Sequence, residues 1–147
     1  MIIREYKPSD KKQVIELVSG ILGNIFNGDP TKFEYIKEFN VSRGYIVYFV
    51  AEVEDESKKI VATMALKKVD NETVRLKRMY VHRNYRRRGI AQKMLNKIVD
   101  YAKEKGYKKM LFSSYSIMEN AGRFNKKNGF VEIEGNPKEK MHLIKYF

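Results

Sequence analysis

The sequence contains no cysteine and only two histidines among its 147 residues. Without cysteine, disulfides, thiolate metal sites and a cysteine nucleophile are all excluded. His82 and His142 lie far apart in the chain and form no metal-ligand pattern. No serine stands at a recognisable spacing from either histidine. We therefore expect no bound metal and no covalent enzyme intermediate.

Long apolar runs are also missing. No apolar stretch approaches the roughly 20 residues that a membrane span needs. The first residues, Met1–Glu5, lack the basic and apolar regions of a secretory signal and are typical of a strand. Hydrophobic residues nevertheless make up 43% of the chain and aromatic residues 12%. This composition predicts one globular domain over residues 1–147 and a cytoplasmic location.

Acidic residues are in the minority, with 18 Asp and Glu against 30 Lys and Arg, a formal net charge of +12. Such an excess fits a polyanionic partner, either nucleic acid or a cofactor rich in phosphate. Most lysines are scattered through turns and strand ends, where they solvate the surface. Neither a helix-turn-helix pattern nor an aromatic RNA-binding motif is present, so nucleic-acid binding is disfavoured.

The local patterns predict alternating strands and helices. The first half combines a strand, a helix after Pro8-Ser-Asp10, a break at Gly23–Gly28, a short second helix and three β-rich runs that form an antiparallel meander. The ranges are Met1–Tyr6, Val14–Leu22, Asp29–Asn40, Tyr45–Val53, Ile60–Val69 and Thr73–Val81. The second half combines a helix, a buried parallel strand, a loop, a short helix and two closing strands. These ranges are Ile90–Lys105, Met110–Phe112, Ser113–Met118, Glu119–Asn128, Phe130–Ile133 and Met141–Phe147.

The third strand of the meander changes its alternation halfway. The apolar residues Val74 and Leu76 stand at even positions, whereas the apolar residues Met79 and Val81 stand at odd positions. A β-bulge at Lys77-Arg78 produces such a shift of one residue. In the alternative interpretation, the long basic side chains simply extend from a regular strand.

Three consecutive arginines, Arg86, Arg87 and Arg88, precede Gly89 and the start of a helix. The first N–H groups of a helix have no partner within it, and the helix dipole is positive at that end. Glycine lets a bulky anion approach the backbone, and guanidinium groups bind phosphate oxygens. This stretch therefore predicts a pyrophosphate-binding site.

Two motifs resemble the GNAT superfamily of acyl-CoA-dependent N-acyltransferases. Arg86-Arg-Arg-Gly89-Ile-Ala91 matches the cofactor loop of that family, and Ala121-Gly-Arg-Phe124-Asn-Lys-Lys-Asn-Gly129-Phe130 matches its later helix. The segment Leu76-Lys-Arg-Met-Tyr-Val81 also follows a common bacterial branch. The resemblance implies an α/β fold of the α+β type. Its central sheet would be mixed but mostly antiparallel, with six to seven strands, a bulged fourth strand and about four helices on both faces.

The resemblance also implies which residues contact acetyl-CoA. Arg86, Arg87, Arg88, Gly89, Ile90, Ala91 and Gln92 would hold the pyrophosphate, mainly through backbone N–H groups. The backbone of Met79, Tyr80 and Val81 would pair with the pantetheine arm, and an N–H near the bulge would polarise the thioester carbonyl. Asn120 and Phe124 would flank the cosubstrate.

Two positions depart from the family pattern. The helix tyrosine that often serves as general acid is Asn125 here, and the acidic residue often found before the bulge is Arg75. A thiolate leaves readily, so the acid is dispensable, but an amine must lose a proton before it attacks. The candidates for that base or for a water relay are Tyr80, Glu52, Glu72, His82, Glu119 and Tyr115.

The sequence thus predicts an acetyl-CoA-dependent N-acetyltransferase that acts by direct attack of a primary amine in a ternary complex. The first alternative is a non-catalytic acyl-CoA-binding module, suggested by Arg75 and Asn125. A nucleic-acid-binding protein is a remote alternative. The sequence leaves open the acceptor amine and a homodimer formed through the C-terminal strand.

Overall fold

The computed structural model describes residues 1–25, 44–115, 119–133 and 140–147. Its strands are β1 (Ile2–Glu5), β2 (Val47–Glu52), β3 (Ile60–Lys68), β4 (Thr73–Val81), β5 (Lys109–Tyr115), β6 (Val131–Glu132) and β7 (Lys140–Tyr146). Its α-helices are α1 (Lys11–Ile25), α3 (Ile90–Glu104) and α4 (Glu119–Lys127), and two 3-10 turns are η1 (Pro8–Asp10) and η3 (Arg83–Tyr85). The short helix expected at Asp29–Asn40 lies outside the described residues.

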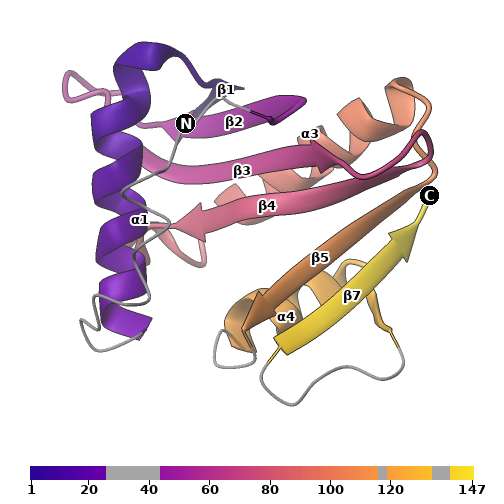
Figure 1. Cartoon of the computed structure of the whole chain (residues 1–147). Coiled ribbons are helices and arrows are strands. Elements are labelled where there is room, and N and C mark those ends of the chain that lie inside the picture. Colours follow the sequence, from indigo (N-terminus) through magenta and orange to yellow (C-terminus); the bar gives the residue numbers. More distant parts are fainter. Residues whose placement is uncertain (26–43, 116–118, 134–139) are drawn as a thin grey trace.

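All seven strands form one sheet in the order β1-β2-β3-β4-β5-β7-β6. Only β4 and β5 run parallel, so the expected mixed and mostly antiparallel sheet is confirmed (Figure 1). The edge strand beside β7 is β6, which pairs with Leu143 and Ile144. No helix within the described ranges is long and apolar enough to cross a membrane.

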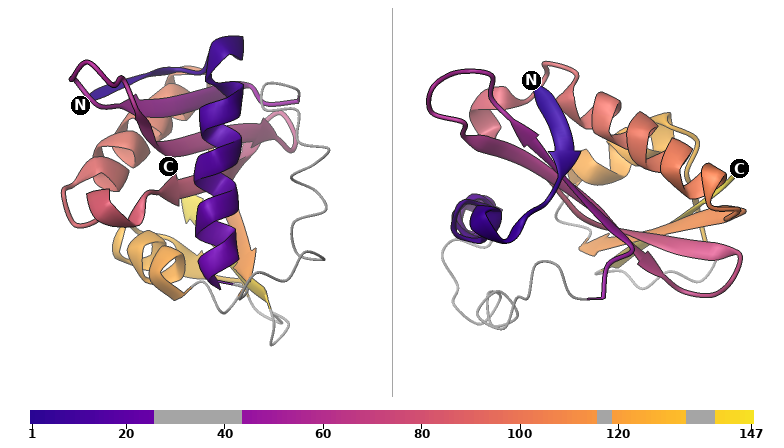
Figure 2. Two further views of the ribbon diagram at one scale, coloured as in Figure 1. Left: turned by 90° about the vertical axis from the view of Figure 1, so that its left-hand side faces the viewer. Right: turned by 90° about the horizontal axis from the view of Figure 1, so that it is seen from above.

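The helices cover both faces of the sheet. Helix α1 packs on one face through an apolar row that includes Val14, Val18 and Leu22. Helix α3 packs on the other through Met94, Leu95 and Ile98, and α4 lies on the same side (Figure 2). Helix α1 continues past the break expected at Gly23 and ends at Ile25, because one glycine costs a helix only about 1 kcal/mol.

The bulge predicted in β4 is confirmed. The β3–β4 register shifts between Thr63 and Ala65, so that Arg78 and Met79 together face Met64. Arg78 adopts a left-handed backbone with φ of 54°, and the buried Thr63 hydroxyl donates a 2.7 Å hydrogen bond to its carbonyl. The shift lets Leu76 and Met79 pack against the same core on the α3 side.

Strands β4 and β5 pair over only four residues each and then separate. Their last pair is Leu76 with Phe112, and β5 continues to Tyr115 along β7 (Figure 1). The loop expected from Ser113 is therefore wrong for its first three residues, because pairing with β7 overrides their weak local signal. This separation leaves the outer edge of β4 beyond Leu76 without a strand neighbour among the described residues.

Candidate active site

The loop before α3 contains two residues with a left-handed backbone. Arg87 has φ of 62° and Gly89, the N-cap residue of α3, has φ of 77°. Within the described chain, no backbone carbonyl accepts from the N–H groups of Arg87–Gln92. Successive N–H groups in such a conformation, together with a helix N-terminus, bind anions. The role predicted for this backbone, binding a pyrophosphate, stays a prediction.

The three arginine side chains differ in their contacts. The Arg86 Nε donates to the Val81 carbonyl at 3.1 Å, which ties the loop to the end of β4. The Arg88 guanidinium lies 5.0 Å from the centre of the Tyr85 ring. Arg87 is exposed and makes no hydrogen bond to another described residue. Next to them, Gln92 uses its side chain to reach Asn128 at 2.8 Å, so α3 and α4 are joined here.

The outer edge of β4 from the bulge to this loop has no strand neighbour among the described residues. Met79 and Val81 pack on the α3 side, whereas Tyr80 packs on the α1 side. Their side chains are therefore held by both cores while the backbone edge faces the gap between β4 and β5. An extended amide-bearing molecule could add to this edge as a further strand.

Helix α4 brings Asn120, Phe124 and Asn125 to the same side of the sheet as α3. Phe124 is partly buried against the core, while Asn120 is exposed and accepts a hydrogen bond from Arg123 at 2.7 Å. Asn125 has no exposed surface, and neither of its amide atoms has a partner in the part of the chain that the structure describes. An unpaired buried amide costs about 1–3 kcal/mol.

Substitutions at Asn125 should separate stability from function. Asn125→Leu removes the unpaired amide at similar volume, so we expect the melting temperature to rise by about 2–4 °C. Asn125→Tyr places a larger ring in a fully buried position and should lower stability by about 1–3 kcal/mol, with no gain in turnover. Thermal unfolding and acetyl transfer measure both; a tenfold faster Asn125→Tyr enzyme would contradict this expectation.

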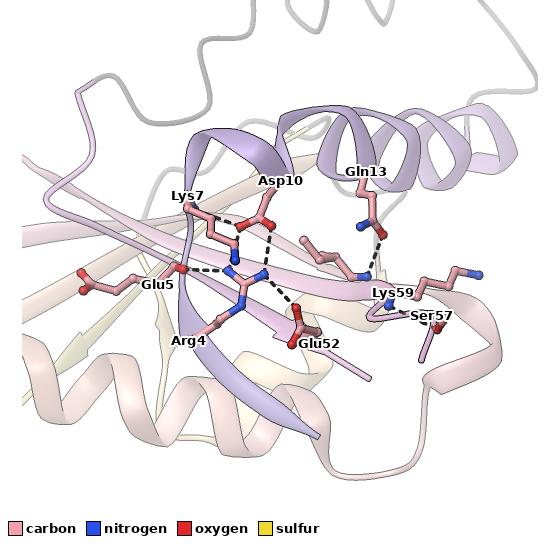
Figure 3. A network of polar contacts seen from close by, with 9 residues as sticks. Arg4, Glu5, Lys7, Asp10, Gln13, Glu52, Ser57 and Lys59 are labelled. Atoms are coloured by element: carbon pink, nitrogen blue, oxygen red, sulfur yellow. Dashed lines mark hydrogen bonds and ion pairs between the residues drawn. The ribbon is translucent and has the colours of Figure 1, made fainter. Parts of the chain in front are cut away.

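Glu52 does not stand free. Its carboxylate accepts a 3.0 Å hydrogen bond from Arg4, which also binds both oxygens of Asp10 at 2.8 and 2.9 Å (Figure 3). Asp10 also accepts a 2.9 Å hydrogen bond from the backbone N–H of Lys7. Its carboxylate therefore closes the turn before α1 rather than capping the N-terminus of that helix. Glu52 therefore belongs to a network that joins β1, β2 and η1.

The other candidate bases occupy different places. Glu72 precedes β4 and lies roughly 25–30 Å from Val81, at the opposite end of that strand. The His82 Nδ1 accepts from the Asn84 backbone at 3.1 Å and caps η3, and burial together with nearby Lys59, Arg83 and Arg86 lowers its pKa. Of the candidates whose side chains the structure describes, Tyr80 and His82 lie beside the outer edge of β4. The side chains of Tyr115 and Glu119 lie outside the described part of the structure.

One pairing was missed by the sequence interpretation, which expected no serine–histidine pair. The Ser113 hydroxyl lies 2.7 Å from the His142 Nδ1 and accepts a 3.0 Å hydrogen bond from Arg75. Ser113 lies on β5, His142 on β7 and Arg75 on β4, close to the point where β5 and β7 separate from β4. Only the strand register brings them together, and no local signal marks it.

Comparison with known proteins identifies the architecture. The family model described as the acetyltransferase (GNAT) family matches residues 15–130. A GNAT acetyltransferase from Staphylococcus aureus Mu50 superposes with a TM-score of 0.85 at 25% identity, covering 99% of this chain and 98% of that one. The PaiA N-acetyltransferase of Thermoplasma acidophilum, solved with coenzyme A, has a TM-score of 0.84 at 17% identity and the same coverage. A GNAT acetyltransferase from Elizabethkingia anophelis with acetyl-CoA bound has a TM-score of 0.69 at 18% identity, covering 99% and 97%.

Proposed function

The chain belongs to the GNAT acetyltransferase family, and from this we propose that it transfers the acetyl group of acetyl-CoA to a primary amine by direct attack in a ternary complex. The observation that carries the proposal is the position of the loop before α3, at the end of the β4 edge that has no strand neighbour among the described residues. Relatives of the same fold were solved with coenzyme A or acetyl-CoA bound. Acetyl-CoA supplies the activated acetyl group as a thioester.

In this proposal the backbone of the chain does most of the binding. The N–H groups of Arg87–Gln92 receive the pyrophosphate, with the arginine side chains adding a positive field. The Met79–Val81 edge pairs with the pantetheine amides, and Phe124 and Asn120 flank them. An N–H group near the bulge stabilises the negative charge that develops on the carbonyl oxygen.

Neither candidate carboxylate whose side chain the structure describes is available as a base at the outer edge of β4. Glu52 is bound by Arg4, Glu72 lies at the far end of β4, and the His82 Nδ1 already caps a turn. Tyr80 stays a candidate for contact with the acceptor, because it lies on the strand that carries the bulge. We propose that solvent takes the amine proton, so that the acceptor's own pKa governs the rate.

The pH dependence of kcat/KM tests this step. We expect its rising limb to move to lower pH when the acceptor amine has a lower pKa, because the titrating group belongs to the substrate. If His82 were the base, the limb would stay at or below about pH 6.5 for every acceptor, since its pKa is lowered. Such a fixed limb, lost in His82→Gln, would show that our assignment is wrong.

The proposed activity itself is tested with an amine panel. Acetyl-CoA is mixed with small amines, amino acids and peptides, and released thiol is measured. We expect at least one acceptor to be turned over. A protein that binds acetyl-CoA but acetylates nothing would fit the non-catalytic binding module instead.

A cytoplasmic location, a single domain and a homodimer remain proposals. Among the described residues, no cluster of three His, Asp or Glu side chains could hold a metal ion.

A further inference from the structure

Arg75, Ser113 and His142 form a polar row on the face of the sheet opposite α3. Their strand neighbours Leu76, Phe112 and Leu143 point into the α3-side core, so the alternation of a strand places the row on the other face. All three side chains are partly buried. On that face α1 contacts β3 and β4, whereas the helix that contacts β5 and β7 is α4, on the opposite side.

The hydrogen bonds in the row hold Arg75 in place. A guanidinium can only donate, so the Ser113 oxygen accepts from Arg75 at 3.0 Å. The same hydroxyl shares a second hydrogen bond, of 2.7 Å, with the His142 Nδ1. Because the serine is fixed on both sides, the guanidinium beside it is held in one orientation. Most of its five N–H donors have no acceptor among the described residues.

The charged side chains that the strand register places around Arg75 are all cationic among the described residues. Lys67 lies directly opposite Arg75 in the β3–β4 register, and like charges in such a pair are destabilising. Lys77 and Arg78 lie on the same face, beside Ala65 and Tyr45. Among the described residues, no carboxylate forms an ion pair with Arg75. A partly buried, oriented guanidinium in cationic surroundings is suited to an external anion.

The row also lies next to the proposed reaction site. Arg75 immediately precedes the last β4–β5 pair, and Ser113 immediately follows it. The bulge that would bind the thioester carbonyl begins only two residues beyond Leu76. An anion at Arg75 would therefore lie within the reach of a small acceptor molecule whose amine is at the bulge.

We propose that the acceptor is a primary amine that also carries a carboxylate, as an amino acid does, and that Arg75 binds this carboxylate. The inference rests on the proposed N-acetyltransferase function and names its substrate class. The planar fork of Arg75 matches two carboxylate oxygens, and Ser113 with His142 keeps that fork in position. Arg75 is thus a specificity residue, which replaces the acidic residue common at this position in the family.

Product binding tests the inference without requiring turnover. N-acetyl derivatives of glycine, leucine, phenylalanine, glutamate and lysine are titrated calorimetrically, each beside the acetamide of its decarboxylated amine, with and without coenzyme A. We expect at least one carboxylated product to bind at least tenfold more tightly than its partner. If no pair shows such a preference, including the case in which nothing binds, the inference is overturned; this comparison needs no variant.

Variants then assign the preference to Arg75. Arg75→Gln should remove it, Arg75→Lys should retain part of it, and Lys68→Gln should leave it unchanged. Lys68 is exposed and follows Lys67 in β3. It carries the same charge as Lys67 but lies on the opposite face of the sheet. A preference that persists in Arg75→Gln would overturn the assignment. If Arg75→Gln does not fold, an undiminished preference in Arg75→Lys would overturn it instead.

Turnover separates this inference from the proposed function. L-leucine and 3-methylbutylamine, and the other matched acceptor pairs, are assayed for thiol release with acetyl-CoA. A higher kcat/KM for the carboxylated members supports both proposals. Equal turnover of the two members in every pair overturns the carboxylate inference and leaves the acetyltransferase function standing. Carboxylated products that bind without any acceptor being acetylated support the anion site but contradict the function.

Discussion

Gly89→Asp lowers the affinity for acetyl-CoA by at least a hundredfold, and this is the largest effect that we expect on function. Gly89 is the N-cap of α3 and has φ of 77°, within the loop that we propose holds the pyrophosphate. A new carboxylate there repels the pyrophosphate and competes for the same N–H groups. A hundredfold loss corresponds to about 2.7 kcal/mol. Acetyl-CoA should raise the melting temperature of the parent protein by mass action but leave this variant unchanged.

The other end of the same helix provides a matched control. Gly106 has φ of 87°, and a Cβ at either glycine would meet no atom within 4 Å, so both aspartates suffer similar backbone strain of about 1–2 kcal/mol. Gly106→Asp should therefore lose similar stability and keep its affinity for acetyl-CoA. Gly89→Asn, which is uncharged, should lose less affinity than Gly89→Asp. If Gly89→Asp binds acetyl-CoA as tightly as the parent does, the cosubstrate site lies elsewhere.

Asp10→Asn produces the largest loss of stability among the changes that we consider. The Asp10 carboxylate is buried and accepts three hydrogen bonds, two from Arg4 and one from the Lys7 backbone. Removing its charge leaves Arg4 with only Glu52 as an ionic partner. Loss of one member of a buried ion pair is costly, and because Arg4 is partly exposed we expect about 2–3 kcal/mol. This loss corresponds to a melting temperature lower by about 5–10 °C.

The same variant should change the acid sensitivity of the protein. Burial raises the pKa of Asp10, but the hydrogen bonds from Arg4 and Lys7 outweigh burial and leave the pKa below its ordinary value. A lowered pKa in the folded state stabilises the protein above the unfolded pKa of about 3.9, and this stability is lost as the pH falls through the folded value. The difference in unfolding free energy between parent and Asp10→Asn should be constant from pH 7 to about 5 and shrink below about pH 4.

An exposed ion pair serves as the comparison for Asp10. Glu132 accepts a 2.6 Å hydrogen bond from Lys126, and both side chains are about half exposed. Exposed pairs contribute about 0–1 kcal/mol. Glu132→Gln should therefore change the melting temperature little at any pH. Equal losses in Asp10→Asn and Glu132→Gln, measured by thermal unfolding across this pH range, would show that the Arg4–Asp10 network does not anchor η1.

Local patterns were sufficient to predict much of the fold. The parity change between Leu76 and Met79 predicts the bulge in β4, since the same apolar face must stay on the core after the extra residue. Gly106 predicts the end of α3, because it supplies the left-handed conformation found there. The loop proposed to bind the pyrophosphate is equally local, since its N–H groups come from consecutive residues before and within one helix turn.

The sequence by itself determined the type of each described strand and α-helix, the bulge, the loop that starts α3 and the family resemblance. These features depend on residues within one or two turns or on a fixed period of apolar side chains. Only the tertiary structure decided which strands separate after Leu76, which carboxylates are already bound and which polar groups meet. Arg4 meets Glu52 across 48 positions, and Ser113 meets His142 across 29. Such pairs depend on strand order and register, which the packing of the whole sheet sets and no local period records.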